Sequence, residues 1–501
     1  MQVFSANFLH EWERSGASFV VYYNGRKVVD IWGGYADRDS ERLWNKDTLN
    51  VAFSSTKAVA ALCVAHLVDQ GHLKYDDSVT EFWPNFGKHG KENVTVRFSA
   101  GLAYTDMKIN YSMANNWKAI ATVFEEQIPN WPPGTETGYH AITYGWLVDQ
   151  IIRRTDPKHR SIGAYFREEF AEKYDLDFHI GLPRCESYRV SRLTAPSLWN
   201  FIQEYLHNPS DFNVGRFIHQ VLTNGLLSRV GQNVPWIAFV KGMTLNNPDL
   251  YEVEQAAVLG IGTSRAMAEL FERFRVGELM SPATFKELTS NYVLQRDIVT
   301  GAYVSRGQGL MVKRFQHKNM TFDLLGHSGY GGQNVRVDLK NNLTFAYMSS
   351  GLKMWLEVLW AVTKLILGIT VIMISSMILM LKLKERRRRP VTTDGRVHEI
   401  FKPVLDTFRS NFRRGWERDG AALCVYYQGE CVVDIWGGFA DRESERRWRE
   451  DTLQIIFSTS KVGLCTKIRL QEKLHLNLCH AIWSNAPAEF YSKIGNTLTE
   501  D

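Results

Sequence analysis

The chain has 501 residues, and its 59 lysines and arginines against 54 aspartates and glutamates give a formal net charge of +5. This length predicts two or three domains, and a chain that is 45% hydrophobic and 23% charged can bury a sizeable core. So small a net charge gives no support for nucleic-acid binding, and we expect none. The six cysteines include no Cys-x-x-Cys pair, so a disulfide framework is not expected. The histidines lack the spacing of metal ligands, and we expect neither a metal nor any other cofactor.

The N-terminal region predicts a β-hairpin over 17–37. Two apolar runs, 19–23 and 27–32, flank Asn24-Gly25, which is the strongest two-residue turn signal. The residues after Met1 contain neither a basic segment nor a sustained apolar core, so a cleaved signal peptide is not expected.

A serine and a lysine three residues apart, Ser54 and Lys57, follow this hairpin and open a segment rich in helix formers. The pattern predicts that this helix stops at Gly71, which then lies just beyond its last residue. Lys57 then lies one turn from Ser54, where an amine can activate a hydroxyl that is a weak nucleophile by itself. The pattern alone is usually a helix cap, and Ser350 and Lys353 match it as well.

Further elements predict an α+β fold. Helical spacing is found over 140–152, 160–175, 196–206 and 264–274. Alternating patterns predict two strands, 313–325 and 334–348, joined through a glycine-rich segment, 326–332. A strand hairpin followed by helices is typical of an α+β domain.

Residues 361–381 predict one transmembrane helix, because the run carries no charge apart from Lys364 and reaches the length that a bilayer core requires. A basic block, 382–389, follows at once and argues against a buried core helix. We therefore expect a single-pass membrane protein. The basic block favours an external first domain, but the missing export signal leaves the side of the membrane open.

The chain then repeats itself. Residues 416–438 restate 12–34, and the match continues to a second serine and lysine, Ser458 and Lys461, where it fails. This second copy holds the nucleophile motif without the rest of a domain, so we expect it to be inactive. The predicted domains are 1–353, a membrane helix with its basic flank over 354–390, and a truncated copy over 391–501.

Two more motifs complete the pattern: Tyr139 follows Pro133-Gly134, and His327-Ser328-Gly329 is expected at the start of a strand. Taken in order with Ser54 and Lys57, these motifs resemble the serine beta-lactamase-related family, which comprises class C beta-lactamases, D-alanyl-D-alanine peptidases and esterase relatives. The resemblance covers about 10–352 and again 410–461. It implies a beta-lactamase/transpeptidase-like α+β fold, with an antiparallel sheet flanked by helices and a helical subdomain.

The resemblance also implies a role for each site residue. Ser54 corresponds to the acylated nucleophile, and Lys57 to the group that helps to deprotonate it. Tyr139 corresponds to the tyrosine that passes protons to the leaving group and then activates water. His327, Ser328 and Gly329 take the place of a Lys-Thr-Gly motif. The backbone N–H groups of Ser54 and Tyr330 would form the oxyanion hole.

Three departures from the family pattern bear on activity. Ala141 stands where asparagine is usual, which removes an amide expected to hold substrate. His327 replaces a lysine that pairs with an acidic substrate group, which points toward esters or amides rather than penicillin-like acids. Phe98 runs directly into Ser99, where the family has several more residues beside the pocket, and such a deletion can strain or disable the site.

Three hypotheses follow. The first is a membrane-tethered serine hydrolase that forms an acyl-enzyme on a small ester or peptide-like amide. The second is a catalytically inactive relative that serves as a membrane-tethered binding or assembly protein. The third is a fusion of two neighbouring family members, in which Met354 onward would anchor a separate protein; transcript sequencing across this region would decide it. The substrate and the oligomeric state stay open.

Overall fold

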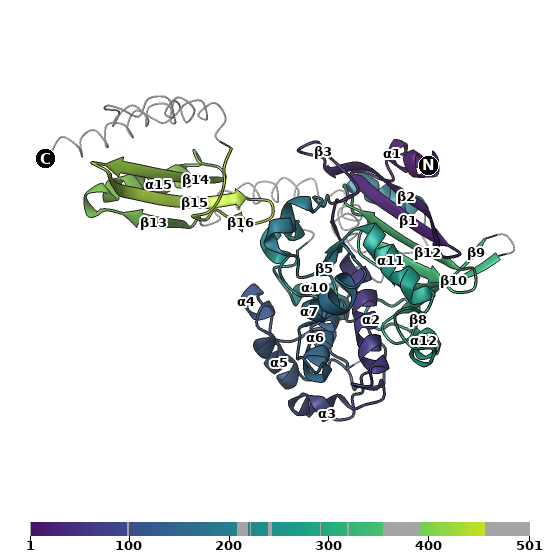
Figure 1. Ribbon diagram of the computed structural model, residues 1–501. Helices are drawn as coiled ribbons and strands as arrows, with labels where there is room; N and C mark the ends of the chain where they lie inside the picture. Colours follow the sequence, from purple (N-terminus) through teal and green to yellow (C-terminus); the bar gives the residue numbers. More distant parts are fainter. Residues whose placement is uncertain are drawn as a thin grey trace. The chain divides into compact units, whose positions relative to one another are not determined.

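The computed structural model describes residues 2–455 apart from 98–99, 208–218, 221, 239–242, 291, 318–319 and 354–390. These residues form two compact units, 2–353 and 391–455 (Figure 1). The predicted membrane helix and the second motif, Ser458 and Lys461, lie outside the described residues. Within the described ranges, every helix is too short or too polar to cross a membrane.

The first unit is built on a nine-stranded antiparallel sheet with the strand order β3-β2-β1-β12-β11-β10-β9-β8-β7. Its strands are β1 (Gly16–Tyr23), β2 (Arg26–Asp37), β3 (Arg42–Leu43), β7 (Val293–Arg296), β8 (Tyr303–Arg306), β9 (Met311–His317), β10 (Met320–Ser328), β11 (Asn334–Asp338) and β12 (Leu343–Ser349). A second sheet of three short strands has the order β4-β6-β5, with β4 (Asn50–Val51), β5 (Phe178–Ile180) and β6 (Gly260–Gly262).

The predicted N-terminal hairpin is confirmed as β1 and β2. Asn24 and Gly25 both have positive φ, 50° and 79°, as a tight two-residue turn of this kind requires. On its other edge, β1 pairs with β12 in an antiparallel register, with Ala17 opposite Ser349. The two ends of the unit therefore meet in the middle of the sheet.

The prediction of two long strands over 313–325 and 334–348 was wrong, because each segment folds into a hairpin. The second one shows the reason. The Asp338 side chain accepts hydrogen bonds from the backbone N–H groups of Lys340 and Asn341, both at 3.0 Å, and Asn342 has a φ of 52°. This turn chemistry reverses the chain inside an otherwise alternating pattern, so that β11 and β12 pair with each other.

Helices cover the sheet and form a separate helical part. Helix α11 (Ser264–Arg275) packs against β1, β11 and β12, and α2 (Thr56–Asp69) packs against α6 (Thr143–Thr155) and α12 (Pro282–Thr289). The others are α1 (Gln2–Leu9), α3 (Val79–Phe82), α4 (Tyr111–Ala114), α5 (Trp117–Glu126), α7 (Ile162–Phe166), α8 (Leu198–His207) and α10 (Leu226–Gln232). Helices α3 to α6 lie together away from the large sheet, as the predicted helical subdomain requires (Figure 1).

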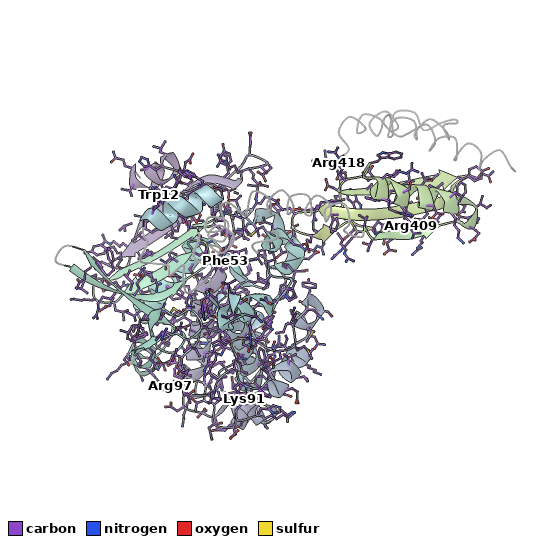
Figure 2. All side chains as sticks on the ribbon, turned by 180° about the vertical axis from the view of Figure 1, so that it is seen from behind. Trp12, Phe53, Lys91, Arg97, Arg409 and Arg418 are labelled. Carbon is purple, nitrogen blue, oxygen red and sulfur yellow. The ribbon has the colours of Figure 1, made fainter. Side chains whose placement is uncertain are left out.

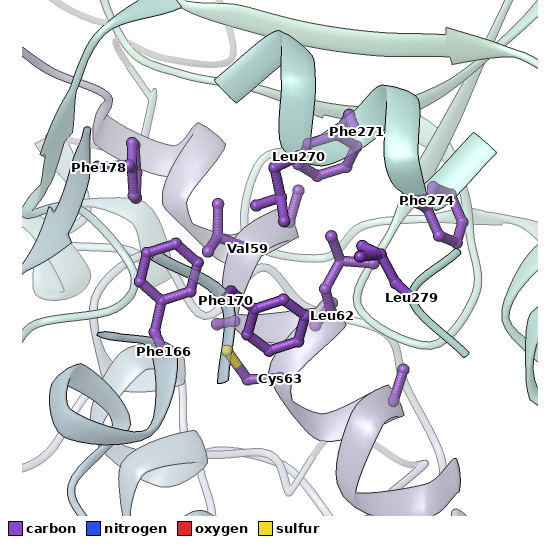
Figure 3. Packing of buried hydrophobic residues seen from close by; sticks show 14 of the residues in the cluster. Val59, Leu62, Cys63, Phe166, Phe170, Phe178, Leu270, Phe271, Phe274 and Leu279 are labelled. Atoms are coloured by element: carbon purple, nitrogen blue, oxygen red, sulfur yellow. The ribbon is translucent and has the colours of Figure 1, made fainter. Parts of the chain in front are cut away.

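Helix α2 is the buried centre of the first unit. Nearly all of its residues are inaccessible to solvent, and aromatic side chains from α7, β5 and α11 surround Val59 and Leu62 (Figure 3). Cys63 lies in the same core. Gly71 has a φ of 75° just after the helix, which confirms its predicted place. Close packing on all sides fixes the position of the N-terminal end of α2, where the serine and lysine lie.

The second unit contains the strand order β13-β15-β14, with β16 paired to β15. Its elements are β13 (Thr393–Val397), α15 (Lys402–Arg414), β14 (Gly420–Tyr427), β15 (Glu430–Asp441) and β16 (Arg446–Arg447). Gly420 pairs with Gly438, as Gly16 pairs with Gly34 in the first unit. Each hairpin also has an irregularity at the same Val-Tyr step. Phe408 and Val433 belong to a small core between α15 and the strands.

Candidate active site

Ser54 lies in a short 3-10 turn, Phe53–Ser55, that leads into α2, so the helix proper begins two residues later than predicted. The backbone of Phe53 has a φ of 46°, which is rare for a residue with a side chain. Its ring is fully buried in the interior of the first unit (Figure 2) and packs 5.5 Å from the ring of Tyr330. Strained backbone held by tight packing is common beside reacting groups, and here it presents a half-buried Ser54.

The Lys57 side chain is buried and holds three contacts. Its Nζ donates to the carbonyl oxygens of Ala141 at 2.7 Å and Ala257 at 2.9 Å, and lies 3.2 Å from Ser54 Oγ. Burial, with a smaller contribution from Arg306, lowers the pKa of Lys57 well below its usual value. In the neutral amine the two carbonyls take both N–H groups, so the lone pair is left for the Ser54 hydroxyl. Lys57 is thus arranged to accept the proton of Ser54.

Tyr139 joins the same group. Its side chain is hydrogen-bonded to Ser54, and Lys57 Nζ lies 4.9 Å from the centre of its ring. Burial raises the pKa of Tyr139 to about 12, although the bond to Ser54 acts in the opposite direction. The phenol therefore stays protonated at neutral pH. It can relay a proton, whereas Lys57 is the stronger candidate for the base.

His327 lies near the end of β10 and not, as predicted, at the start of a strand, because β10 runs on to Ser328. It follows Gly326, the last residue of β10 that pairs with β9. Its ring stacks on Tyr139 with the ring centres 6.0 Å apart. His327 Nδ1 donates to the carbonyl of Ser328 at 2.6 Å, because a carbonyl can only accept, and Nε2 is buried without a hydrogen-bond partner in the described chain. Burial and the nearby Lys57 lower the pKa of His327 well below its usual value. The imidazole is therefore neutral, with an acceptor at Nε2.

The segment after β10 touches the turn that carries Ser54. Ser55 Oγ donates to the carbonyl of His327 at 3.2 Å, and a Cβ added to Gly329 would come within 2.5 Å of the Ala52 carbonyl oxygen. This close approach requires glycine at 329. Ser54 and Tyr330, the two residues predicted to form an oxyanion hole, are the chain neighbours of Ser55 and Gly329, which make these contacts.

The structure therefore gathers the predicted catalytic residues of the first unit. Lys57 and Tyr139 each contact Ser54, and His327 stacks on Tyr139. Ser328 is exposed and accepts a hydrogen bond from Arg336 at 2.6 Å. Ala141 offers no side-chain amide where asparagine is usual, and its backbone carbonyl accepts a hydrogen bond from Lys57. Residues 98 and 99, at the predicted deletion, lie outside the described residues.

Sequence reasoning missed Arg306. Its guanidinium carbon lies 5.6 Å from the centre of the Tyr139 ring, and its Nη1 pairs with Asp297 at 2.5 Å. Asp297 is fully buried, and its carboxylate neutralises the positive charge that Arg306 brings close to the Tyr139 ring. A lone arginine in a short strand carries no sequence signal, and only the fold brings it to the site.

The second Ser-x-x-Lys match in the first unit has an ordinary structural role. Ser350 Oγ accepts a hydrogen bond from the Gly16 backbone at 3.2 Å, and Lys353 forms an ion pair with the buried Glu13. Of these two motifs, only that of Ser54 therefore brings its lysine to its serine in the arrangement given above, whereas Ser350 and Lys353 make structural contacts. Across the described ranges, no three histidine, cysteine or acidic side chains are grouped as they would be around a metal ion.

Comparison with known proteins agrees with this geometry. The sequence model of the family described as Beta-lactamase matches residues 4–362 and 408–477. The chain belongs to the beta-lactamase family. The predicted resemblance is thereby confirmed, together with the beta-lactamase/transpeptidase-like α+β fold of antiparallel sheet and helices.

Several relatives within the beta-lactamase family are hydrolases by name. The chain is 30% identical over 329 residues to the esterase/beta-lactamase LipL of Mycobacterium tuberculosis, over 64% of this chain and 69% of that protein. It resembles the crystal structure of a penicillin-binding protein homolog from Caulobacter crescentus, with 31% identity, a TM-score of 0.58, and coverage of 71% of this chain and 91% of the other. A family VIII carboxylesterase gives 26% identity, a TM-score of 0.60 and the same coverage. The predicted place among serine hydrolases of esters and amides is confirmed at the level of the family.

Proposed function

We propose that this chain is a serine hydrolase that cleaves an ester or an amide through an acyl-enzyme on Ser54. The observation that carries the proposal is the 3.2 Å contact between Lys57 Nζ and Ser54 Oγ, made by an amine that is buried and held by two backbone carbonyls. A desolvated lysine with a lowered pKa can act as a base near neutral pH, and a serine hydroxyl needs such a base to attack.

The reaction has two steps. In the first, Ser54 Oγ bonds to the substrate carbonyl carbon while its proton passes to Lys57, and the bond to the leaving alcohol or amine breaks as that group takes a proton through Tyr139. In the second, water attacks the acyl carbon, its proton returns along the same route, and Ser54 is released with the acid as product. The backbone N–H groups of Ser54 and Tyr330 are assigned to the oxyanion of both steps.

The neutral His327 favours a substrate without an acidic group at this position. Its Nε2 is a buried acceptor, so it suits an N–H or O–H donor of the substrate and repels a carboxylate. A lysine there would instead offer a cation. We therefore propose a neutral ester or a peptide-like amide as the substrate, in preference to a penicillin-like acid.

A fluorophosphonate probe on the full chain tests this proposal, because it labels a serine only when that serine is activated. We expect one labelled site, loss of labelling in Ser54→Ala, and no loss in the matched variant Ser458→Ala from the second motif. Labelling that survives Ser54→Ala would refute the assignment. A folded wild-type chain that takes no label would instead favour the inactive binding or assembly protein.

We also propose residues 361–381 as a single-pass membrane anchor, preceded along the chain by the first domain over 1–353 and followed by the truncated copy over 391–501. The support is the length and low charge of the run and the basic block after it. Alkaline extraction of membranes tests the anchor. We expect the full chain to stay in the pellet and a variant with Ile366→Arg, Ile369→Arg and Ile372→Arg to leave it; release of both would contradict the anchor.

A further inference from the structure

Two cysteines face each other across the hairpin of the second unit. Cys424 on β14 and Cys431 on β15 are both exposed, and their Sγ atoms lie 3.7 Å apart. The strand register explains the contact. Cys431 pairs with Tyr426 and Cys424 pairs with Asp434, so that all four side chains share one face of the hairpin.

This face is open in the described part of the second unit, in contrast to the first. The small core between α15 and the strands uses the opposite face, where Val433 and Ile435 are almost completely buried. In the first unit, Val20 stands at the position of Cys424 and is only 1% exposed beneath α11, and Lys27 stands at the position of Cys431. The paired thiols therefore belong to the second hairpin alone, and reagents in solution can reach them.

We propose that Cys424 and Cys431 form a redox-responsive dithiol, which small-molecule disulfides of the glutathione type convert into a disulfide within the hairpin. This site is separate from Ser54 and does not rest on the proposed hydrolase activity.

The conversion is an ordinary thiol–disulfide exchange in two steps. The Cys431 thiolate attacks one sulfur of the oxidised reagent, forms a mixed disulfide and releases one reduced reagent molecule. The Cys424 thiolate then attacks the Cys431 sulfur, forms the Cys424–Cys431 bond and releases the second. Both thiol protons end on the two released thiols. In balance, one reagent disulfide is reduced by two electrons and the protein dithiol is oxidised by two.

Geometry and acidity both support this order of attack. A disulfide needs its sulfur atoms about 2.05 Å apart, and rotation of the two side chains can close the present 3.7 Å while the flanking strand pairs stay in place. Partial desolvation and the adjacent Cys431 thiol raise the pKa of Cys424 to about 11, so Cys424 is mostly protonated at neutral pH and is assigned to the second step. After Cys431 has reacted, Cys424 is the nearest thiol to the mixed disulfide.

Mass spectrometry of the full chain provides the test, with glutathione disulfide as the probe. After titration with glutathione mixtures and alkylation of the remaining thiols, trypsin releases 419–442 as one peptide that holds both cysteines, since no lysine or arginine lies inside it. We expect this peptide to carry no alkyl group and to be two hydrogens lighter than the reduced peptide. After cleavage at Glu430, the disulfide should keep the fragment with Cys424 joined to the fragment with Cys431. Half-oxidation should need about tenfold less glutathione disulfide than half-modification of Cys185, which is exposed but single.

Single variants provide the control. Cys424→Ser and Cys431→Ser should each leave one thiol that carries a single glutathione, with no disulfide inside the 419–442 peptide. The proposal is overturned if the wild-type peptide carries two glutathiones or stays fully alkylatable while Cys185 reacts. It is also overturned if Cys424 or Cys431 is found linked to another cysteine of the chain.

Discussion

Gly329→Ala should disable the site through the backbone rather than through any reacting group. The new Cβ would lie 2.5 Å from the Ala52 carbonyl oxygen and 2.7 Å from Gln333 Cβ, whereas ordinary contact begins at 3.4 Å. The two segments must therefore separate by about 0.9 Å. Ala52 lies two residues before Ser54, so this shift reaches the nucleophile. A displacement of about 1 Å costs about 10²-fold in rate, or about 2.7 kcal/mol of transition-state stabilisation.

The assay compares fluorophosphonate labelling rates and thermal unfolding of Gly329→Ala with those of a matched variant, Gly231→Ala. An added Cβ at Gly231, near the end of α10, meets nothing within 4 Å, so alanine there should stabilise the protein by up to about 1 kcal/mol and leave labelling unchanged. Overpacking at 329 should cost about 1–3 kcal/mol of stability. The reasoning is refuted if Gly329→Ala reacts within about threefold of the wild-type rate, or if both variants lose activity equally.

Three further predictions concern buried charges. The labelling rate should rise with pH through the lowered pKa of Lys57, well below 10.5, and Lys57→Arg, which stays charged, should label about 10²–10⁴-fold more slowly; a flat pH profile would argue against Lys57 as the base. Arg306→Gln should cost about 3–5 kcal/mol in urea unfolding because it strands the buried Asp297, and adding Asp297→Asn should recover most of that loss; equal stability of the single and double variants would contradict the pair. His140 is buried, and desolvation lowers its pKa from 6.5 to about 4, so the unfolded chain binds its proton first and stability should fall by about 3 kcal/mol as pH drops from 6.5 to 4. His140→Gln should remove that share of the acid sensitivity, and an unchanged slope of unfolding free energy against pH would show that another group causes it.

Local chemistry explains which features the sequence predicted correctly. Asn24-Gly25 specifies its turn by positive φ, and Gly71 ends α2 for the same reason. Ser54 and Lys57 are three residues apart, so a single helical turn brings them together wherever the rest of the chain lies. The order of motifs then indicated the family and, through it, Tyr139 and His327.

The remaining features depend on contacts that no local pattern encodes. The carbonyl of Ala257 orients Lys57 from 200 residues away, and any residue type would offer the same atom. Arg306 reaches Tyr139 only through the strand order of the sheet. The prediction missed the turn between β11 and β12, because the alternating residues on both sides of the turn suggested a single strand despite the polar residues between them.

The pairing of β1 with β12 has a consequence for synthesis of the chain. The Gly16 backbone bonds to Ser350, 334 residues later, so the first strand leaves the ribosome long before its neighbour has been translated. Until then its outer edge, 17–23, has unsatisfied peptide groups and can recruit other chains. A transcript truncated before the codon for Leu343 would encode a chain without β12. The outer edge of β1 would then stay unpaired, and the product should aggregate. The hairpin of β14 and β15 has no such delay, because its strands are translated one directly after the other.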